Sequence, residues 1–241
     1  SVKYMLSSNP VDESPLRTLV GSSNGNYLYR NNYCLPLGYM MSEKAIKGWE
    51  SSMLDRIGSL NSLAQQLGAK GDMLYPATCT QSQAAGDTTI DISEDGYYYA
   101  DYVTCNADSL TVSRDDGWTQ QYGKTTHRYL LDLGECKAGT KVHITNLNAE
   151  TIEYHVYRLN FKAMCTAYET LSEQTMSLEK MTDRRIVGSI DVRQAGRLIL
   201  SVPADEGWSL YVDGKKTKIK PFADALIGVH LKEGTHKIEL R

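Results

Sequence analysis

The sequence predicts a mainly β protein with a minor helical part: two tandem β-sandwich domains, of the jelly-roll or immunoglobulin-like kind, behind an N-terminal strand-and-helix segment. Three observations predict this fold. From about residue 75 apolar side chains recur at every second position, whereas helical spacing is confined to two stretches. Many short strand-like runs are separated by turn residues. A strand pattern in the first half also returns in the second half.

Residues 1–74 form the predicted N-terminal segment, which packs on the sandwiches. It begins with short strand-like runs, and an SSNG turn precedes the last of them. These runs are VKYML, LRTLV and NYLYR.

The main helical region is predicted over about 42–67, where apolar residues recur at spacings of three and four. A capping serine opens it, and Gly68 is a suitable stop. Because Gly48 and Gly58 weaken the middle, two shorter helices are the alternative. Trp49 lies on the apolar stripe and is expected in the core.

The first predicted sandwich covers 75–163, and the second covers 164–241 together with a short helix at about 163–173. Period-two alternation identifies the strands of both. They are TTIDI, GYYYADYV, SLTVS, RYLLDL, TKVHITNL and IEYHVYRLNF in the first, and TMSLEKM, RRIVGSIDV, GRLILSV, WSLYV, KTKIK, ALIGVHL and THKIELR in the second.

An internal repeat links the two predicted sandwiches. TIDI, with Gly96 four residues after it, matches SIDV, with Gly196 four residues after it. Later in each half, a Gly-Thr turn separates two strand-like runs. The spacing is too long for a solenoid repeat, so the pattern favours duplication of one β domain.

Composition excludes some classes of protein. A net charge of −3 argues against a dedicated nucleic-acid binder. No apolar run approaches the ~18–20 residues of a membrane span, and the start does not resemble a signal peptide. The end at Arg241, directly after a strand-like run, suggests a piece of a longer protein. The 16 Tyr against 2 Phe fit half-buried strands, with a sugar- or protein-binding surface as the alternative.

Motifs for chemistry are missing from the sequence. The five cysteines form no CxxC pair, which argues against a zinc site. Buried free thiols are expected, and one disulfide such as Cys105–Cys136 is the alternative. No HExxH, GxSxG, P-loop or GxGxxG occurs. The sequence therefore predicts no catalytic residue, no metal ion and no cofactor.

Two acidic turns precede a Gly-Trp pair, and they occupy matching points of the two repeats. A flat apolar ring beside a carboxylate that accepts hydrogen bonds from hydroxyls suits a sugar site. The alternative is a Trp that packs at the mouth of a sandwich beside a solvated turn. The candidate ligand-binding residues are Trp208, Asp205, Glu206, Trp118, Asp116 and Tyr211.

A hairpin with a basic return strand follows Trp208. Asp213-Gly214 is a strong two-residue turn signal. Trp208 begins an alternating row with Leu210 and Val212, which is expected to face the core. The lysines of the return strand either protect a sheet edge or contact an anionic membrane surface or wall polymer. They are Lys215, Lys216, Lys218 and Lys220.

Both ends of the chain resemble the YfhO family of bacterial membrane proteins. YRNNYCLPLGYM, which starts at Tyr29, resembles the family segment Y-x-N-x-Y-A-L-P-L-G-Y, with Cys34 where Ala is usual. The stretch from Gly188 to Lys215 resembles G-x-I-D-V…L-S-I-P-Y-D-K-G-W-x-V-x-V-D-G-K, with Ala204 where an aromatic is usual. The last thirteen residues before Arg241 fit G-V-x-L-x-x-G-x-H-x-I-E-L.

The resemblance implies a polytopic membrane protein similar to GT-C glycosyltransferases, which act on cell-surface polymers such as lipoteichoic acid. This chain is then the large extracytoplasmic portion near the C-terminus, and its own membrane domain lies outside it. In GT-C enzymes the catalytic acid lies in an early loop between membrane helices, and no residue here matches that loop. No catalytic residue is carried over.

Three functions remain open at this point. The first is an extracytoplasmic accessory region that binds or positions a cell-surface glycan or teichoic-acid acceptor. The alternative is a purely structural or protein-interaction region with no ligand of its own. An independent hydrolase is the third, and it lacks any motif. Exposure of the Trp118 and Trp208 rings would favour the first reading, and their burial the second.

Overall fold

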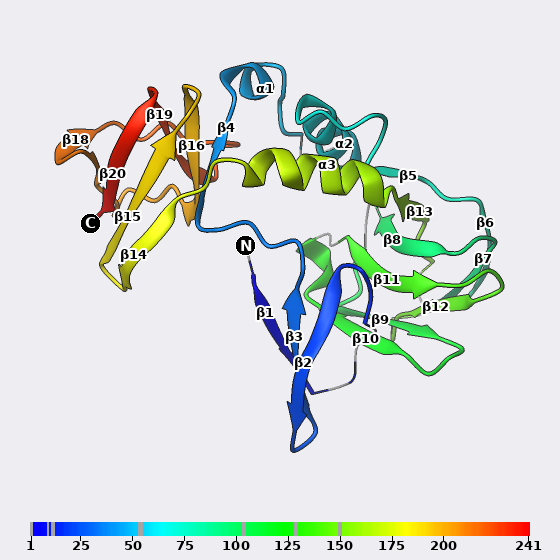
Figure 1. Cartoon of the computed structure of the whole chain (residues 1–241). Coiled ribbons are helices and arrows are strands. Elements are labelled where there is room, and N and C mark those ends of the chain that lie inside the picture. The colour runs from blue at the N-terminus through cyan, green and yellow to red at the C-terminus, as the bar shows by residue number, and fades with distance from the viewer. Residues whose placement is uncertain are drawn as a thin grey trace. The chain divides into compact units, whose positions relative to one another are not determined.

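The computed structural model describes residues 2–8, 10, 13–52, 55–102, 105–127, 130–148 and 151–241, apart from the side chain of His127. The chain forms two compact units, each with its own core (Figure 1). Unit 1 comprises residues 1–5, 31–73 and 161–241, and unit 2 comprises 6–30 and 74–160. The predicted mainly β fold with two sandwiches is confirmed. The three-part division at 74 and 163 stays a prediction.

Unit 2 contains a sandwich of a five-stranded sheet, order β10-β9-β12-β7-β6, and a four-stranded sheet, order β11-β8-β13-β5. Burial alternates along β7 and β9, as predicted for strands with one face in a core. The strands are β5 (Leu74–Pro76), β6 (Cys79–Ala84), β7 (Asp87–Ile92), β8 (Gly96–Tyr102), β9 (Ser109–Arg114), β10 (Thr119–Gly123), β11 (Leu131–Cys136), β12 (Lys141–Thr145) and β13 (Tyr154–Leu159), with a short 3₁₀ turn at Thr125–His127.

Unit 1 contains the second sandwich, with a five-stranded sheet, order β14-β15-β20-β17-β18, and a three-stranded sheet, order β19-β16-β4. Its strands are β4 (Gly38–Met41), β14 (Ser177–Thr182), β15 (Arg185–Val192), β16 (Gly196–Pro203), β17 (Leu210–Val212), β18 (Lys215–Thr217), β19 (Leu226–Leu231) and β20 (Gly234–Leu240). Its helices are α1 (Glu43–Lys47), α2 (Arg56–Gln66) and α3 (Phe161–Ser172).

The strand β16 is buried on both faces. Leu198 and Leu200 belong to the core between the two sheets, whereas Ile199 belongs to a second core with residues of α1, α2 and α3. All three side chains are fully buried. This explains why GRLILSV is almost continuously apolar, which is the pattern of a strand covered on both sides.

The predicted helix over 42–67 is wrong as one continuous element, and the alternative of two shorter helices is correct. Ser42 caps α1 by accepting a hydrogen bond from the Ala45 N–H, at 3.2 Å. Gly48 ends α1, and α2 begins only at Arg56. Gly68, with φ +94°, follows the end of α2 as predicted. Met53, part of the predicted stripe, lies outside the described residues.

Gly58 plays a different part from the expected helix break. Asp55 caps α2, and its Oδ1 accepts a hydrogen bond from the Gly58 N–H at 2.8 Å. A Cβ at position 58 would collide with the Asp55 carboxylate. Gly58 therefore lies inside α2, where its small size makes room for the cap.

The two sandwiches share one strand order. The series β10-β9-β12-β7-β6 in unit 2 corresponds, in order along the chain, to β18-β17-β20-β15-β14 in unit 1. In the smaller sheets β11-β8 corresponds to β19-β16. The third strand differs, because β13 follows its partner β8 in sequence, whereas β4 comes from the N-terminal segment. This topology agrees with the predicted repeat.

A separate three-stranded sheet, order β1-β3-β2, is formed by β1 (Tyr4–Ser7), β2 (Arg17–Ser23) and β3 (Asn26–Asn31). The predicted turn lies between β2 and β3, with φ +49° at Asn24 and +74° at Gly25. Positive φ at both central residues is the geometry of a type I′ hairpin. The strands β4, β5, β6 and β10 were not predicted, because they are very short or largely polar.

Candidate functional site

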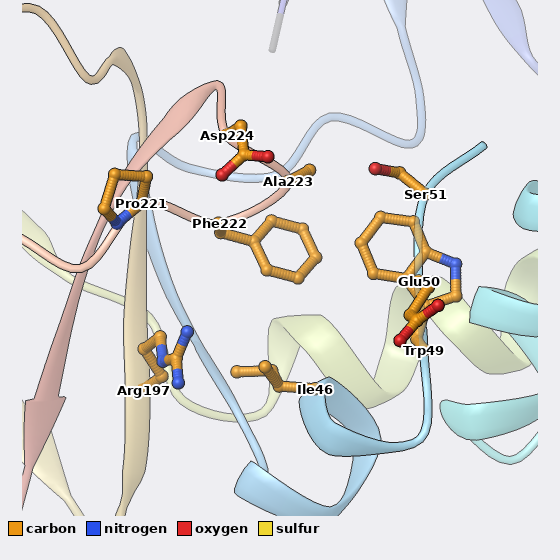
Figure 2. A pocket seen from close by; sticks show the side chains of 9 residues that line it. All are labelled: Ile46, Trp49, Glu50, Ser51, Arg197, Pro221, Phe222, Ala223 and Asp224. Carbon is orange, nitrogen blue, oxygen red and sulfur yellow. The ribbon is translucent and has the colours of Figure 1, made fainter. Parts of the chain in front are cut away.

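A pocket of about 350 Å³ lies within unit 1, lined by nine residues from four parts of the chain (Figure 2). The loop between α1 and α2 and the loop between β18 and β19 supply most of it, and we call it the Trp49 pocket. The lining residues are Ile46, Trp49, Glu50, Ser51, Arg197, Pro221, Phe222, Ala223 and Asp224.

The aromatic part of the Trp49 pocket is two stacked rings. Trp49 and Phe222 have ring centroids 5.0 Å apart and an interplanar angle of 24°. The Trp49 Nε1–H donates to the backbone carbonyl of Ser59 at 2.7 Å, which fixes the orientation of the indole. Trp49 is half-buried beside the core, so the expectation of a core position is met only in part.

Arg197, which lines another side of the pocket, belongs to a charged network with two residues outside the lining. Arg197, on β16, donates from Nη2 to Glu43 Oε2 at 3.3 Å, and His230 Nδ1 lies 3.2 Å from Glu43 Oε1. Although burial opposes the effect, hydrogen bonding by His230 and the charge of Arg197 lower the pKa of Glu43. The Arg197 Nε is buried and has no hydrogen-bond partner among the described residues.

The rim of the pocket carries exposed polar groups. Glu50, Ser51 and Asp224 are exposed, and Figure 2 shows Asp224 and Ser51 on the upper side of the pocket and Glu50 beside Trp49. Ala223 and Asp224 have φ values of +54° and +52°, so both occupy the left-handed region. The Ala225 N–H donates to the Phe222 carbonyl at 3.1 Å and closes this tight turn.

The Trp49 pocket is chemically suited to binding. Its lining contains no His and no Cys, and its one hydroxyl residue, Ser51, is exposed at the rim. A nucleophile needs an adjacent base to be activated, and the lining offers Ser51 no His or Lys for that role. What the lining offers is an aromatic surface beside one guanidinium and two carboxylates, and polar groups of this kind can fix the orientation of a bound ligand.

Trp118 and Asp116, two of the predicted ligand-binding residues, lie in unit 2 at the turn between β9 and β10. Arg114 covers the Trp118 ring, with its Cζ 4.8 Å from the ring centroid, and pairs with Asp116 at 2.9 Å. Although desolvation opposes the effect, hydrogen bonds from the Trp118 N–H and Arg114 lower the pKa of Asp116. Both side chains are thus engaged within the turn.

Trp208 lies in unit 1, just before β17. It packs against the sandwich core with Leu210 and Val212, so the predicted core-facing row is confirmed. Asp205 and Glu206 are exposed in the preceding turn, where Asp205 Oδ1 accepts from the Gly207 N–H at 3.1 Å. Trp208, like Trp118, is half-buried, so ring exposure does not separate the sugar-binding reading from the structural one.

The expectation that the two Gly-Trp turns occupy matching points of the repeats is wrong. Trp118 follows the turn between β9 and β10, whereas Trp208 lies between β16 and β17, which correspond to β8 and β9. The turn equivalent to that of Trp118 is Asp213-Gly214, between β17 and β18. The pattern of an acidic residue, Gly and Trp predicts a turn before a strand. It does not tell between which two strands of the sandwich that turn lies.

Tyr211 lies on the opposite face of β17 from Leu210 and Val212, next to two cationic side chains. Lys216 and Glu239 are its cross-strand partners, and the Arg241 Cζ lies 4.6 Å from its ring centroid. Arg185 and Arg241 pair with Glu239 at 2.6 and 2.7 Å. Hydrogen bonds from Arg241 and then Arg185 lower the pKa of Glu239 to about 2.

We call this outward surface of the five-stranded sheet the basic face. Lys237, which is exposed and pairs with Ser189, extends it along β20. Four cationic side chains of this face lie around the Glu239 carboxylate, and Asp191 lies further along the face opposite Thr235. Its residues are Arg185, Tyr211, Lys216, Lys237, Glu239 and Arg241. All four lysines predicted for anionic contact are exposed on or after the edge strand β18, and they are Lys215, Lys216, Lys218 and Lys220.

The tyrosines of β8 account for part of the Tyr excess. Tyr98 and Tyr102 are buried in the core of unit 2, and each hydroxyl donates to a backbone carbonyl. Tyr97 points to the outer face, and its hydroxyl donates to Asp132 Oδ2 at 2.8 Å. Burial raises the pKa of Tyr97 and of Tyr99 beside it. These rings provide bulk with one polar end, as expected for half-buried strands.

Metal-binding and redox groups are dispersed. Within the described ranges no three His, Cys, Asp or Glu side chains gather as a set of metal ligands. All five cysteines are free thiols, and Cys105 and Cys136, the pair considered for a disulfide, are both buried. None of the helices formed by the described residues has the length and apolar character needed to cross a membrane.

Sequence reasoning did not find the Trp49 pocket. Trp49 was assigned to a helical stripe, although Gly48 directly before it was the available sign of a loop. Nothing in the sequence brings Arg197 and Phe222 next to the α1–α2 loop. The pairing of β4 with β16 makes that connection, and it joins the N-terminal segment to the C-terminal sandwich.

Comparison with known proteins gives one informative match. The profile of a family described as "Bacterial membrane protein YfhO" matches residues 1–241, the whole chain. A search of curated proteins found no match. Among solved structures, a quercetin 2,3-dioxygenase from Acinetobacter baumannii aligns at 9% identity with a TM-score of 0.16. That alignment covers 71% of this chain and 66% of the dioxygenase, slightly under two thirds of its length.

Proposed function

Because the chain belongs to the YfhO family of bacterial membrane proteins, we propose that it is an extracytoplasmic accessory region that binds or positions a cell-surface glycan or teichoic-acid acceptor. In this proposal the membrane domain of the parent protein carries the glycosyltransferase chemistry and is the direct partner of this chain. The region itself contributes binding and no catalytic residue.

The basic face is the observation that carries this proposal. Tyr211 offers a ring beside Lys216 and Arg241, and Lys237 and Arg185 lie on the same face of the sheet. Cations in a row attract a polymer of phosphate groups, and each lysine near an anionic surface contributes about 1 kcal/mol. A ring among them adds an apolar contact for the glycan part of such a polymer.

Binding to lipoteichoic acid tests the proposal. The 241-residue chain is titrated calorimetrically with purified lipoteichoic acid at low and high salt. Neutralising two charges in Lys216→Gln/Lys237→Gln is expected to weaken binding by about tenfold or more at low salt. Salt should weaken the binding of the wild type more than that of the variant, because exposed charges are screened.

The matched control is Lys162→Gln/Lys70→Gln, which removes two exposed lysines from α3 and a loop of the same unit. It should bind like the wild type. If the control and the basic-face variant lose affinity equally, only overall charge matters, and the basic face is not the site. Trp208→Phe in the same titration tests the predicted sugar contact at Trp208, and Asp205→Asn/Glu206→Gln tests the two carboxylates before it.

A second function, a structural or protein-interaction region without a ligand, is favoured by one observation. Arg114 engages both Trp118 and Asp116, and Trp208 packs on its core. These contacts support packing roles for both Trp residues. Folded protein that binds neither lipoteichoic acid nor neutral glycans would support this reading and contradict the acceptor-binding one.

A further inference from the structure

We propose that the Trp49 pocket binds a neutral, hydroxyl-rich ring, such as one pyranose unit of a glycan. The inference deepens the proposed function and rests on it for the source of the sugar. The pocket itself shares no residue with the basic face. Its size, about 350 Å³, is at the lower end of the range of roughly 300–1,000 Å³ for small-molecule sites.

The apolar surface of the pocket is preorganised. The stack of Trp49 on Phe222 and the hydrogen bond from Trp49 Nε1 to Ser59 hold the indole in place. Phe222 is almost fully buried, and two backbone hydrogen bonds with Leu226 hold it next to the first residue of β19. A rigid aromatic surface gives up little conformational entropy when a flat C–H face of a sugar ring lies against it.

The polar groups of the pocket suit a ligand with several hydroxyls better than a ligand with a single charge. Glu50 and Asp224 only accept hydrogen bonds when ionised, and Arg197 only donates them. A hydroxyl both donates and accepts, so a ring that carries several hydroxyls satisfies both kinds of group. Figure 2 shows these groups on different sides of the hollow, with Arg197 away from Glu50 and Asp224 above.

The same charges disfavour ionic ligands. A phosphate at Arg197 would face two carboxylates in the same lining, and a simple cation at those carboxylates would face the guanidinium. Arg197 is also already paired with Glu43, so its charge is balanced without an anion.

Fluorine NMR with 5-fluorotryptophan tests the proposal on the full chain. The protein has three Trp, so three signals are expected, and Trp49→Phe identifies the Trp49 signal. Methyl glycosides of glucose, galactose and N-acetylglucosamine are titrated into the millimolar range. At least one should shift the Trp49 signal saturably and leave the signals of Trp118 and Trp208 in place.

Isosteric variants locate the binding groups without disturbing the core. Glu50→Gln/Asp224→Asn removes both rim charges from exposed side chains, and the Asn keeps a residue that tolerates positive φ. The sugar affinity is expected to fall about tenfold or more, because charge-assisted hydrogen bonds become neutral ones. Glu169→Gln/Glu233→Gln, which also removes two exposed carboxylates of unit 1, should leave it unchanged.

Several outcomes would overturn the inference. They are a Trp49 signal that responds to glycerol phosphate or choline instead of the glycosides, a response confined to Trp208, or no response at all. Loss of lipoteichoic-acid binding in the basic-face variant, together with a silent Trp49, would leave the proposed function standing without the pocket. A saturable Trp49 shift without polymer binding would leave the pocket standing and contradict the acceptor role.

Discussion

At the residue scale, Gly58 is the clearest case of a position that has no room for a side chain beside a helix cap. A glycine inside a helix is normally a weakness, and replacement by Ala gains up to about 1 kcal/mol. Here a Cβ would displace the Asp55 carboxylate, whose cap on α2 contributes about 1 kcal/mol. Gly58→Ala should therefore change the free energy of unfolding by close to zero, as measured by urea denaturation.

A double-mutant cycle makes this prediction specific. In the Asp55→Ala background the cap is already lost, so Gly58→Ala should regain its normal stabilisation of about 1 kcal/mol. The coupling free energy between the two positions is then about 1 kcal/mol. Equal effects of Gly58→Ala in both backgrounds would show that the cap and the glycine are independent.

Single residues were predicted well where a local rule decides them. Ser42 was identified as a cap and Gly68 as a stop, because both act on their own chain neighbours. For Arg197 and Phe222, no local rule indicated that these residues line a pocket. Their place in the pocket depends on which strands pair, which a residue and its neighbours do not determine.

At the element scale, the β17–β18 hairpin depends on its two turn residues. Asp213 and Gly214 have φ of +50° and +78°, which confirms the predicted two-residue turn. Gly214→Ala places a Cβ in the left-handed region and should cost about 1–2 kcal/mol in unfolding free energy. Gly207→Ala is the control, since its φ is ordinary and a Cβ there meets no atom closer than 3.8 Å. Equal costs would contradict the turn assignment.

The same hairpin is tied to β20 by a pair that depends on pH. His236 Nδ1 lies 2.8 Å from Asp213 Oδ2, and this hydrogen bond raises the pKa of His236 above its usual 6.5. The stabilisation is therefore complete below about pH 6.5 and lost as the pH rises through the raised pKa. Because the pair is partly exposed, its contribution is at most about 1 kcal/mol.

His236→Gln tests this pair by urea denaturation at several pH values. The wild type should be more stable than the variant near pH 6, and the difference should shrink as the pH rises past the raised pKa of His236. Asp213→Asn, which keeps a residue that tolerates positive φ, should flatten the pH dependence in the same way. A stability difference that grows with pH would contradict the assignment.

Elements were predicted where they repeat a pattern for long enough. The strands β7, β15 and β16 show alternation or a continuous apolar run over six to eight residues. In contrast, β10 is polar and β4 has only four residues, all buried, so neither shows a period. An element that lies within a core on all sides gives no alternating pattern.

At the scale of the whole molecule, unit 1 needs two distant parts of the chain. β4 pairs with β16, and α2 packs with α3 over the buried Ile199. Residues 161–241 alone would expose this side, including the edge of β16, and are expected to give a poorly dispersed NMR spectrum. Adding residues 31–73 as a separate chain should restore dispersion. A well-dispersed spectrum of 161–241 alone would show that the second sandwich folds independently, as its predicted boundary implies.

The global arrangement was predictable only in outline. The repeat TIDI/SIDV predicted two related sandwiches, because like sequences favour like folds, and the strand orders agree. It gave no information about the third strand of each smaller sheet, where the two halves differ. The Trp49 pocket lies next to β4, the strand in which the two halves differ. This explains why the sequence did not predict the pocket.

The different origins of β4 and β13 have a consequence for synthesis on the ribosome. When β16 emerges, β4 has long been made and is available to cover its edge. When β8 emerges, its neighbours β11 and β13 are still untranslated. Open edges invite pairing with other chains. During synthesis both edges of β8 in the first sandwich therefore stay open, and they can pair with other chains until β11 and β13 have been made. In the second sandwich β4 can cover one edge of β16 as soon as β16 is made.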